Sequence, residues 1–310
     1  MTVDRIATNT QAQYMLNQIN SANVALNLSQ QQVSSGKVAS DYAGYGDKVA
    51  LMEAARSAGA RVDAYQAATK QALTQADLQN TQISALSDLG QQLRTALTDA
   101  VGQNNGSTLM TEADSVFQAA SQILNAKDAN GKYIYGGENN DQPPFTATSL
   151  ADLASMPDVA SAFQNGTIKN SVRIGDGETV QVGQLASDLG SGLIGTLKAV
   201  AQYQNANGNF GETLTTEQST FLSGQITAAK TVTDQLNNAT AANGFVYNRL
   251  QDASDNQDTM STLYQGFVSD IQDVDMPTAI TKLNQNQVAL QAALQVTSRL
   301  QQVSLLNYMS

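Results

Sequence analysis

Both ends of the chain are long, almost uncharged runs of Gln, Asn, Ala and Ser in which single apolar residues recur at heptad spacing. Near the start, the apolar positions step three, four, three, four and seven residues along the chain, through Ala12, Met15, Ile19, Ala22, Leu26 and Val33. Near the end they step three, seven and four residues, through Ile280, Leu283, Leu290 and Leu294. An apolar repeat of about 3.5 residues predicts helices that pair as a coiled coil.

The apolar seams of these two predicted helices are narrow. Most of the stability of a helix in a protein comes from packing its apolar face, and ordering each residue costs backbone entropy. Because each seam has so few large apolar side chains, their burial recovers less free energy than this ordering costs. We therefore expect the two ends to order only against each other and against neighbouring molecules. For seam residues such as Leu26 and Leu290, packing within one chain is the alternative.

Between the ends, the pattern predicts helices that run out and back. A long amphipathic helix is expected from about residue 47 to 101, and another from about 111 to 126. Aromatic and β-branched residues after Asn130-Gly131 predict a strand over 132–137. Residues 172–182 predict a β-hairpin that turns at Gly175-Asp176-Gly177. Helices are expected again over 193–203 and from beyond Gly211 to about 271, and Pro277 suits the first turn of the last helix.

The predicted fold class is mainly α: a long antiparallel helical hairpin with coiled-coil termini, small β elements in the rod domain and a small mixed, β-containing inserted domain. Residues 1–40 and 277–310 are assigned to the terminal coiled-coil domain. Residues 41–145 and 193–276 are assigned to a helical rod domain with a short β-strand, and residues 146–192 to a small inserted outer domain. Pro143-Pro144 marks a boundary, because neither residue has a backbone N–H to donate.

The composition argues against most enzyme classes. The chain has no His, Cys or Trp, which removes Ser-His-Asp and Cys-His nucleophiles, thiolate metal sites and disulfides. We expect no catalytic residue, no cofactor and no metal site. With 16 Lys and Arg against 27 Asp and Glu, the formal net charge is −11, which disfavours nucleic acid and anionic lipid as partners.

Targeting signals are also missing from the pattern. No run of 18 apolar residues predicts a membrane span or membrane insertion. The first residues lack the apolar segment of a cleavable signal peptide, so export would take another route.

Three groups of residues could support the binding of a metal ion, a phosphate or a sugar. Each group also has a simpler structural interpretation, which we favour. Asp252, Asp255 and Asp258 could offer oxygen ligands to Ca²⁺, but on a helix they spread around a solvated face. The turn at residues 175–177 lacks the Lys-Ser/Thr of a phosphate loop and is interpreted as a hairpin turn. Tyr133 and Tyr135 could stack on a sugar, although packing of the predicted strand is favoured.

Several segments resemble the flagellin superfamily. Gln32-Val33-Ser34-Ser35-Gly36-Lys37 is similar to the Ser-Ser-Gly segment that closes the first terminal helix throughout that superfamily. Residues 131–137, followed by Pro143-Pro144-Phe145, resemble the strand and Pro-Pro-Phe exit of its hook–filament junction family. Residues 303–309 are also closer to the ending of that family than to the ending of filament flagellins. Further similarity lies in Asn243-Gly244, Asn248-Arg249-Leu250 and residues 270–275.

This resemblance implies a structural subunit of the bacterial flagellum that forms the junction between hook and filament, with terminal helices that order on assembly. The implied location is extracellular, at the hook–filament junction. The implied partners are a ring of identical subunits, the hook-side junction protein, flagellin, an export chaperone and the flagellar type III export apparatus. The implied assembly interface consists of Met15, Ile19, Leu26, Val33, Ile280, Leu283, Leu290, Leu294, Leu305, Leu306 and Tyr308.

Two alternatives stay open at this point. The chain could be a filament-forming flagellin, or an exported flagellin-like surface protein that binds polysaccharide through the inserted domain.

Overall fold

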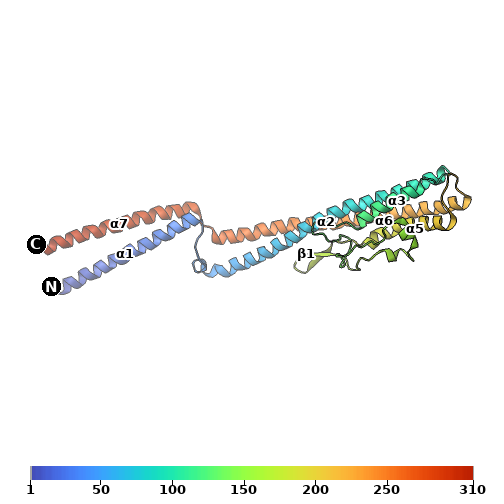
Figure 1. Cartoon of the computed structure of the whole chain (residues 1–310). Coiled ribbons are helices and arrows are strands. Elements are labelled where there is room, and N and C mark those ends of the chain that lie inside the picture. Colours follow the sequence, from blue (N-terminus) through green and yellow to red (C-terminus); the bar gives the residue numbers. More distant parts are fainter. Residues whose placement is uncertain (1, 310) are drawn as a thin grey trace. The chain divides into compact units, whose positions relative to one another are not determined.

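A computed structural model of the chain describes the backbone of residues 2–309 and the side chains of residues 10–299. The fold is mainly α, as the sequence predicts, with one small antiparallel sheet among the described residues. The chain divides into two compact units, one formed by residues 1–61 and 259–310 and the other by residues 62–258. Each unit is described by itself below, and Figure 1 colours both along the sequence.

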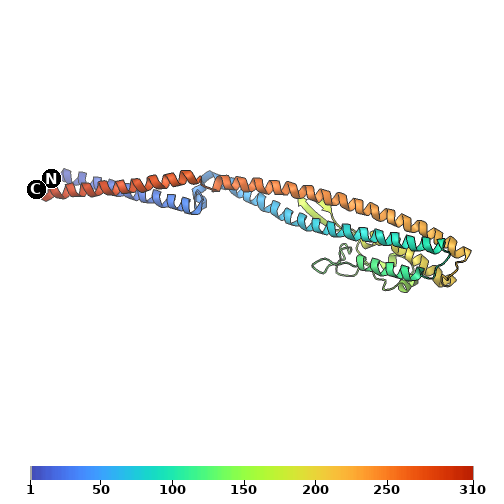
Figure 2. The same ribbon diagram turned by 90° about the horizontal axis from the view of Figure 1, so that it is seen from above.

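The first unit contains the two ends of the chain. Helix α1 (Thr2–Ser35) and helix α7 (Met276–Met309) run side by side in opposite directions (Figures 1 and 2). The 3-10 helix η1 (Tyr42–Lys48) leads into α2 (Val49–Gly102), and α6 (Thr216–Gln272) leads into α7. Pro277 lies in the first turn of α7, where its missing N–H has no cost.

Backbone hydrogen bonds join the exit of α1 to the segment between α6 and α7. Gly36 ends α1 at a φ of 68°, a left-handed conformation that glycine adopts without strain. The Val38 N–H donates to the Gln272 carbonyl at 2.8 Å, and the Val274 N–H donates to the Gly36 carbonyl at 2.9 Å. These bonds explain why the Ser-Ser-Gly segment closes the first helix at this point.

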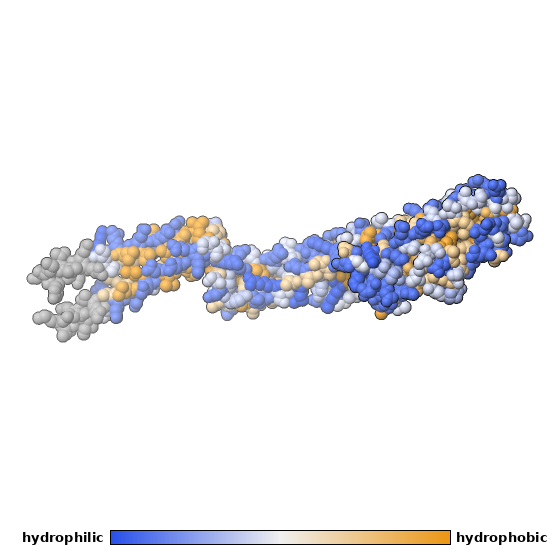
Figure 3. All heavy atoms as spheres, viewed as in Figure 1, coloured by the Kyte–Doolittle hydropathy of each residue, from blue (hydrophilic) through white to orange (hydrophobic). Residues whose placement is uncertain are grey.

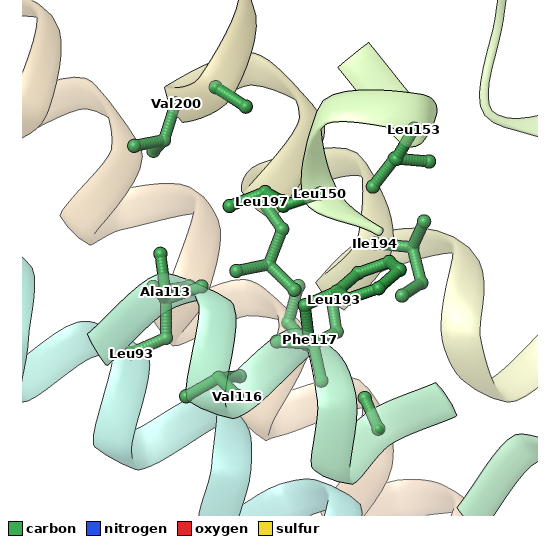
Figure 4. Close-up of a cluster of buried hydrophobic side chains, with 14 of the residues drawn as sticks. Leu93, Ala113, Val116, Phe117, Leu150, Leu153, Leu193, Ile194, Leu197 and Val200 are labelled. Carbon is green, nitrogen blue, oxygen red and sulfur yellow. The ribbon is translucent and has the colours of Figure 1, made fainter. Parts of the chain in front are cut away.

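The second unit is built on the parts of α2 and α6 that fall within residues 62–258. Three further helices, α3 (Leu109–Leu124), α4 (Leu150–Ser155) and α5 (Ala186–Asn207), pack with them around the main hydrophobic core. In Figure 4, Phe117 of α3 gathers with Leu193 and Leu197 of α5 and with Leu93 of α2. All four of these side chains are fully buried or nearly so.

A β-hairpin packs beside a second, smaller apolar cluster between α2 and α6. Strands β1 (Ser171–Gly175) and β2 (Glu178–Gln181) pair antiparallel, and Gly177 turns between them at a φ of 77°. The amide nitrogen of Gln257 on α6 donates to the Ile174 carbonyl at 2.7 Å and to the Thr69 hydroxyl of α2 at 3.0 Å. The Tyr65 hydroxyl also donates to Asp176 at 2.8 Å. The predicted hairpin is therefore present and is tied to both long helices.

One local prediction was wrong. Residues 132–137 do not form a strand; the segment makes a single β-bridge between Lys127 and Tyr133 and otherwise consists of turns. The aromatic side chain that suggested a strand, Tyr135, is buried and donates its hydroxyl proton to Gln82 at 2.6 Å. Helix α6 runs through Asn243-Gly244 without a break, as the apolar pattern predicts, and the buried Asn243 amide donates to the Ala76 carbonyl of α2 at 2.7 Å.

The segment expected to form an outer domain contributes to both apolar clusters. Leu150, Leu153 and Leu189 belong to the main core, together with residues of α2 and α6. Val180 and Val182 belong to the smaller cluster beside α2 and α6. Residues 146–192 therefore help to build the core of the second unit.

Candidate assembly surface

One face of α1 lies against α7. Its seam residues Met15, Ile19, Ala22, Leu26 and Val33 are all half-buried, and the heptad position between the last two is held by Ser29. Ser29 is only 4% exposed and donates its hydroxyl proton to the Ala25 carbonyl at 2.8 Å. The heptad expected on α1 is therefore the face that packs within the chain.

The facing side of α7 differs from the expected one. Leu283 and Leu290 are half-buried, as expected for seam residues. Ile280 and Leu294 are 45% and 50% exposed, so the prediction that they lie in the same seam was wrong. The buried or half-buried positions of α7 follow a different three-and-four pattern: Ala279, Leu283, Asn286, Leu290, Ala293 and Thr297.

A polar contact explains this difference. The side-chain amide of Asn286 donates to the Ala25 carbonyl at 3.1 Å and lies 2.6 Å from the Ser29 hydroxyl oxygen. Turning α7 to bury Ile280 and Leu294 would move the half-buried Asn286 amide away from both of these acceptors, and a polar group that is buried without a partner is costly. Sequence reasoning searched for apolar residues only and so missed this pair.

A second set of apolar side chains on the same two helices is exposed to solvent. On α1, most of these side chains lie on the side of the helix away from the seam. Their spacings along the chain are made up of steps of three and four residues. The members on both helices are Tyr14, Leu16, Val24, Leu28, Ile280, Val288, Leu294 and Val296. We call these eight residues the outer apolar set. In Figure 3, hydrophobic residues coloured orange lie along both helices of this unit.

Six members of the outer apolar set were not anticipated from the heptads. Tyr14, Val24 and Leu28 occupy a second three-and-four series on α1, which a search for two apolar faces would have found. On α7, Val288 lines a shallow hollow of about 410 Å³ together with Asn284, Gln285, Ala289 and Ala292. The predicted interface residues Leu305, Leu306 and Tyr308 lie outside the residues whose side chains are described.

The surface around these side chains carries almost no charge. No Asp, Glu, Lys or Arg occurs between Ile6 and Gly36, and residues 276–310 contain only Lys282 and Arg299. Neither segment contains an acidic residue, so the excess of acidic residues behind the net charge of −11 lies entirely in the rest of the chain. Because like charges repel, a nearly neutral surface is the part of this acidic molecule on which identical copies can approach one another most easily.

Comparison with known protein families matches residues 226–309 to the bacterial flagellin C-terminal helical region. Among solved structures, the fold is similar to that of a candidate flagellar hook-associated protein from Vibrio parahaemolyticus, with a TM-score of 0.59 and 13% identity. That alignment covers 73% of this chain and 97% of the other. The chain therefore contains a region similar to the flagellin C-terminal helical region, and its fold is similar to that of this hook-associated protein.

A second solved structure has a similar fold. Bacillus cereus FlgL aligns with a TM-score of 0.53 and 17% identity, over 70% of this chain and 98% of FlgL. At these identities the two alignments demonstrate a shared fold. A comparison with curated protein sequences finds no match. The similarity to flagellar proteins therefore consists of the C-terminal region, through the family model, and of the fold, through the two solved structures.

The region matched to flagellins includes much of the candidate surface. It begins within α6 and covers all of α7, with Asn286 and the four α7 members of the outer apolar set. Within the part of the chain that the structure describes, no group of three or more acidic, His or Cys side chains is placed to hold a metal ion. The helices searched over the same residues include none with the length and apolarity to cross a membrane.

Proposed function

We propose that the chain is a non-catalytic structural subunit of the bacterial flagellum at the junction of hook and filament. In this proposal α1 and α7 pack against neighbouring subunits, whereas the second unit supplies a core that folds without them. The neighbours are further copies of the chain in a ring, the hook-side junction protein and flagellin. The location is the extracellular flagellum.

The observation that carries this proposal is the outer apolar set on an uncharged helix pair. In the described parts of the two terminal helices, only Ser29 and Ala279 are fully buried. The second unit, by contrast, buries several dozen residues in two apolar clusters. Exposed apolar side chains that repeat along a helix favour a protein–protein contact, and the missing charge favours a contact between identical acidic molecules.

The weak packing of the two terminal helices is also compatible with export of the chain in an unfolded form. A helix pair with so little buried surface lies at the low end of local stability and opens readily. Opening would let the ends pass in extended form through the type III export apparatus, with the aid of an export chaperone and without a cleaved signal peptide. Folding coupled to binding would then stabilise the helices at the growing tip.

The junction role is preferred to that of a filament subunit for two reasons. Residues 131–137 with Pro143-Pro144-Phe145, and the ending at residues 303–309, resemble the junction family. The solved structures described above include a candidate hook-associated protein and FlgL. The match to a flagellin C-terminal region keeps the filament role as the competing candidate.

Immunogold electron microscopy of the flagellum separates these two roles. A tag inserted at the exposed Gly177 turn of the hairpin would mark each copy of the chain. A junction subunit predicts gold at one point between hook and filament, and a strain without the protein should carry hooks without filaments. Gold along the whole filament would contradict the junction role and support the filament role.

Removal of residues 301–310 provides a second test of the proposal. The truncated chain should keep the folded core of the second unit but fail to join the hook, so that filaments remain absent. Restoration of normal filaments by the truncated chain would contradict the assembly role of the C-terminal helix.

A further inference from the structure

The seam between α1 and α7 matches large side chains with small or polar ones. The Asn286 amide reaches Ala25 and Ser29, so residue 286 lies level with that turn of α1. Counting outward in heptad steps along two antiparallel helices then gives six layers: Met15 with Thr297, Ile19 with Ala293, Ala22 with Leu290, Leu26 with Asn286, Ser29 with Leu283, and Val33 with Ala279. Every layer joins one larger apolar residue to a smaller or polar one, which is how facing side chains interdigitate.

Helix α7 contains a second possible seam. Ile280 and Leu294 each follow a seam alanine by one residue, which is about 100° around a helix. Rotation of α7 about its own axis by roughly half that angle would keep Leu283 and Leu290 near α1. The same rotation would bring Ile280 and Leu294 into the interface in place of Ala279 and Ala293. That orientation would bury more apolar surface, yet the structure leaves Ile280 and Leu294 about half exposed.

We propose that Asn286 is a positioning residue that determines which face of α7 turns toward α1. Rotation to the alternative seam would separate Asn286 from Ser29 and Ala25 and bring Gln287 toward the interface. One polar residue at an inner position of a helix pair lowers stability but selects a single arrangement. Asn286 thereby keeps Ile280 and Leu294 on the outer surface. Since both helices belong to one chain, this inference does not depend on the proposed function.

Disulfide trapping in the full-length chain tests the proposal. The protein has no Cys, so within one molecule a double variant can form only the intended bond. Ile19→Cys with Ala293→Cys reports the observed orientation, and Ile19→Cys with Leu294→Cys reports the rotated one. Oxidation in dilute solution captures paired helices even if the pair opens often. Both pairs are measured with Asn286 intact and with Asn286→Ala, so the bias of the cysteines themselves cancels.

The ratio of the first product to the second should fall about tenfold in Asn286→Ala, which corresponds to about 1.4 kcal/mol at 25 °C. Asn284→Ala is the matched control, because Asn284 is exposed and lines the hollow on α7; its ratio should not change. Ser29→Ala should give an intermediate shift, and Ser29→Thr, which keeps the hydroxyl, should restore the ratio.

Three results would overturn the proposal. The first is an unchanged ratio in Asn286→Ala, and the second is equal yields of both products with Asn286 intact. The third is an equal drop in both yields in Asn286→Ala, since Asn286 would then stabilise the helix pair without choosing its orientation.

Discussion

Replacement of Val288 by Ser should weaken assembly much more than it destabilises the solitary chain. Val288 is 64% exposed, so only about a third of its side chain is removed from water within one molecule. Full burial of a valine side chain contributes about 2 kcal/mol. The solitary chain therefore has about 0.7 kcal/mol to lose, and about 1.3 kcal/mol remains available to a neighbouring subunit.

Two assays separate these contributions. Urea unfolding of the purified chain should show a change of less than about 1 kcal/mol for Val288→Ser, because most of the side chain is already in water. Incorporation into flagella, compared between variant and parent chains expressed at equal levels, should fall about tenfold, as 1.3 kcal/mol per contact implies.

The matched control is Ile168→Ser. Ile168 is an equally exposed apolar residue, at 66%, but it lies in the second unit. This variant should assemble normally. Normal incorporation of Val288→Ser, or an equal loss for the Ile168 variant, would refute the reasoning that the outer apolar set forms the contact.

Three further predictions concern the second unit. Leu193→Ala, at a fully buried core position, should lower the free energy of unfolding by about 2–5 kcal/mol, measured by urea denaturation; a loss below 1 kcal/mol would contradict the assigned core. Gln257→Ala leaves two buried partners unpaired and should cost about 1–3 kcal/mol, whereas the exposed Gln251→Ala should cost little in the same assay. The pKa of Glu138 is lowered mainly by the backbone N–H of Thr167, so its ionised form adds stability that is present above its unfolded pKa and is lost as pH falls through the lower folded pKa. Glu138→Gln should flatten the dependence of Tm on pH in that acidic range, and a profile identical to that of the parent chain would disprove the effect.

Most of the helices could be predicted from the sequence because the apolar periodicity and the helix-breaking residues indicate the same helix boundaries. The gap between α2 and α3 falls at Gly102–Gly106, and α7 begins beside Pro277, as expected. The hairpin was predictable for the same reason, since Gly177 has the positive φ that its turn requires. In these segments the sequence alone determines where each element begins or ends.

The errors arose where tertiary contacts decide the structure. Tyr135 occupies a segment rich in β-formers, but its buried hydroxyl bonds to Gln82 of α2 and no neighbouring strand pairs with the segment. Such tertiary contacts override strand propensity. Tertiary contacts also hold the hairpin, since Gln257 of α6 donates to the Ile174 carbonyl of β1. Deletion of residues 146–189 should therefore disrupt the core of the second unit as well as any outer surface.

The face of α7 was harder to predict than its existence. Apolar periodicity favours Ile280 and Leu294 as seam residues, and only the contact of Asn286 with Ser29, 257 residues apart in the sequence, shows why they are exposed. No local pattern contains that information. The same limit applies to the outer apolar set, whose exposed face becomes evident only when the seam has been identified.

Amide hydrogen exchange of the dilute, purified full-length chain, compared with the same chain assembled in flagella, tests the central claim most directly. We expect rapid exchange over residues 10–35 and 276–299 in the solitary chain, slow exchange in the core helices over residues 83–124, and protection of all these segments after assembly. Terminal helices as protected in the dilute chain as the core helices would contradict the claim that neighbouring subunits stabilise them.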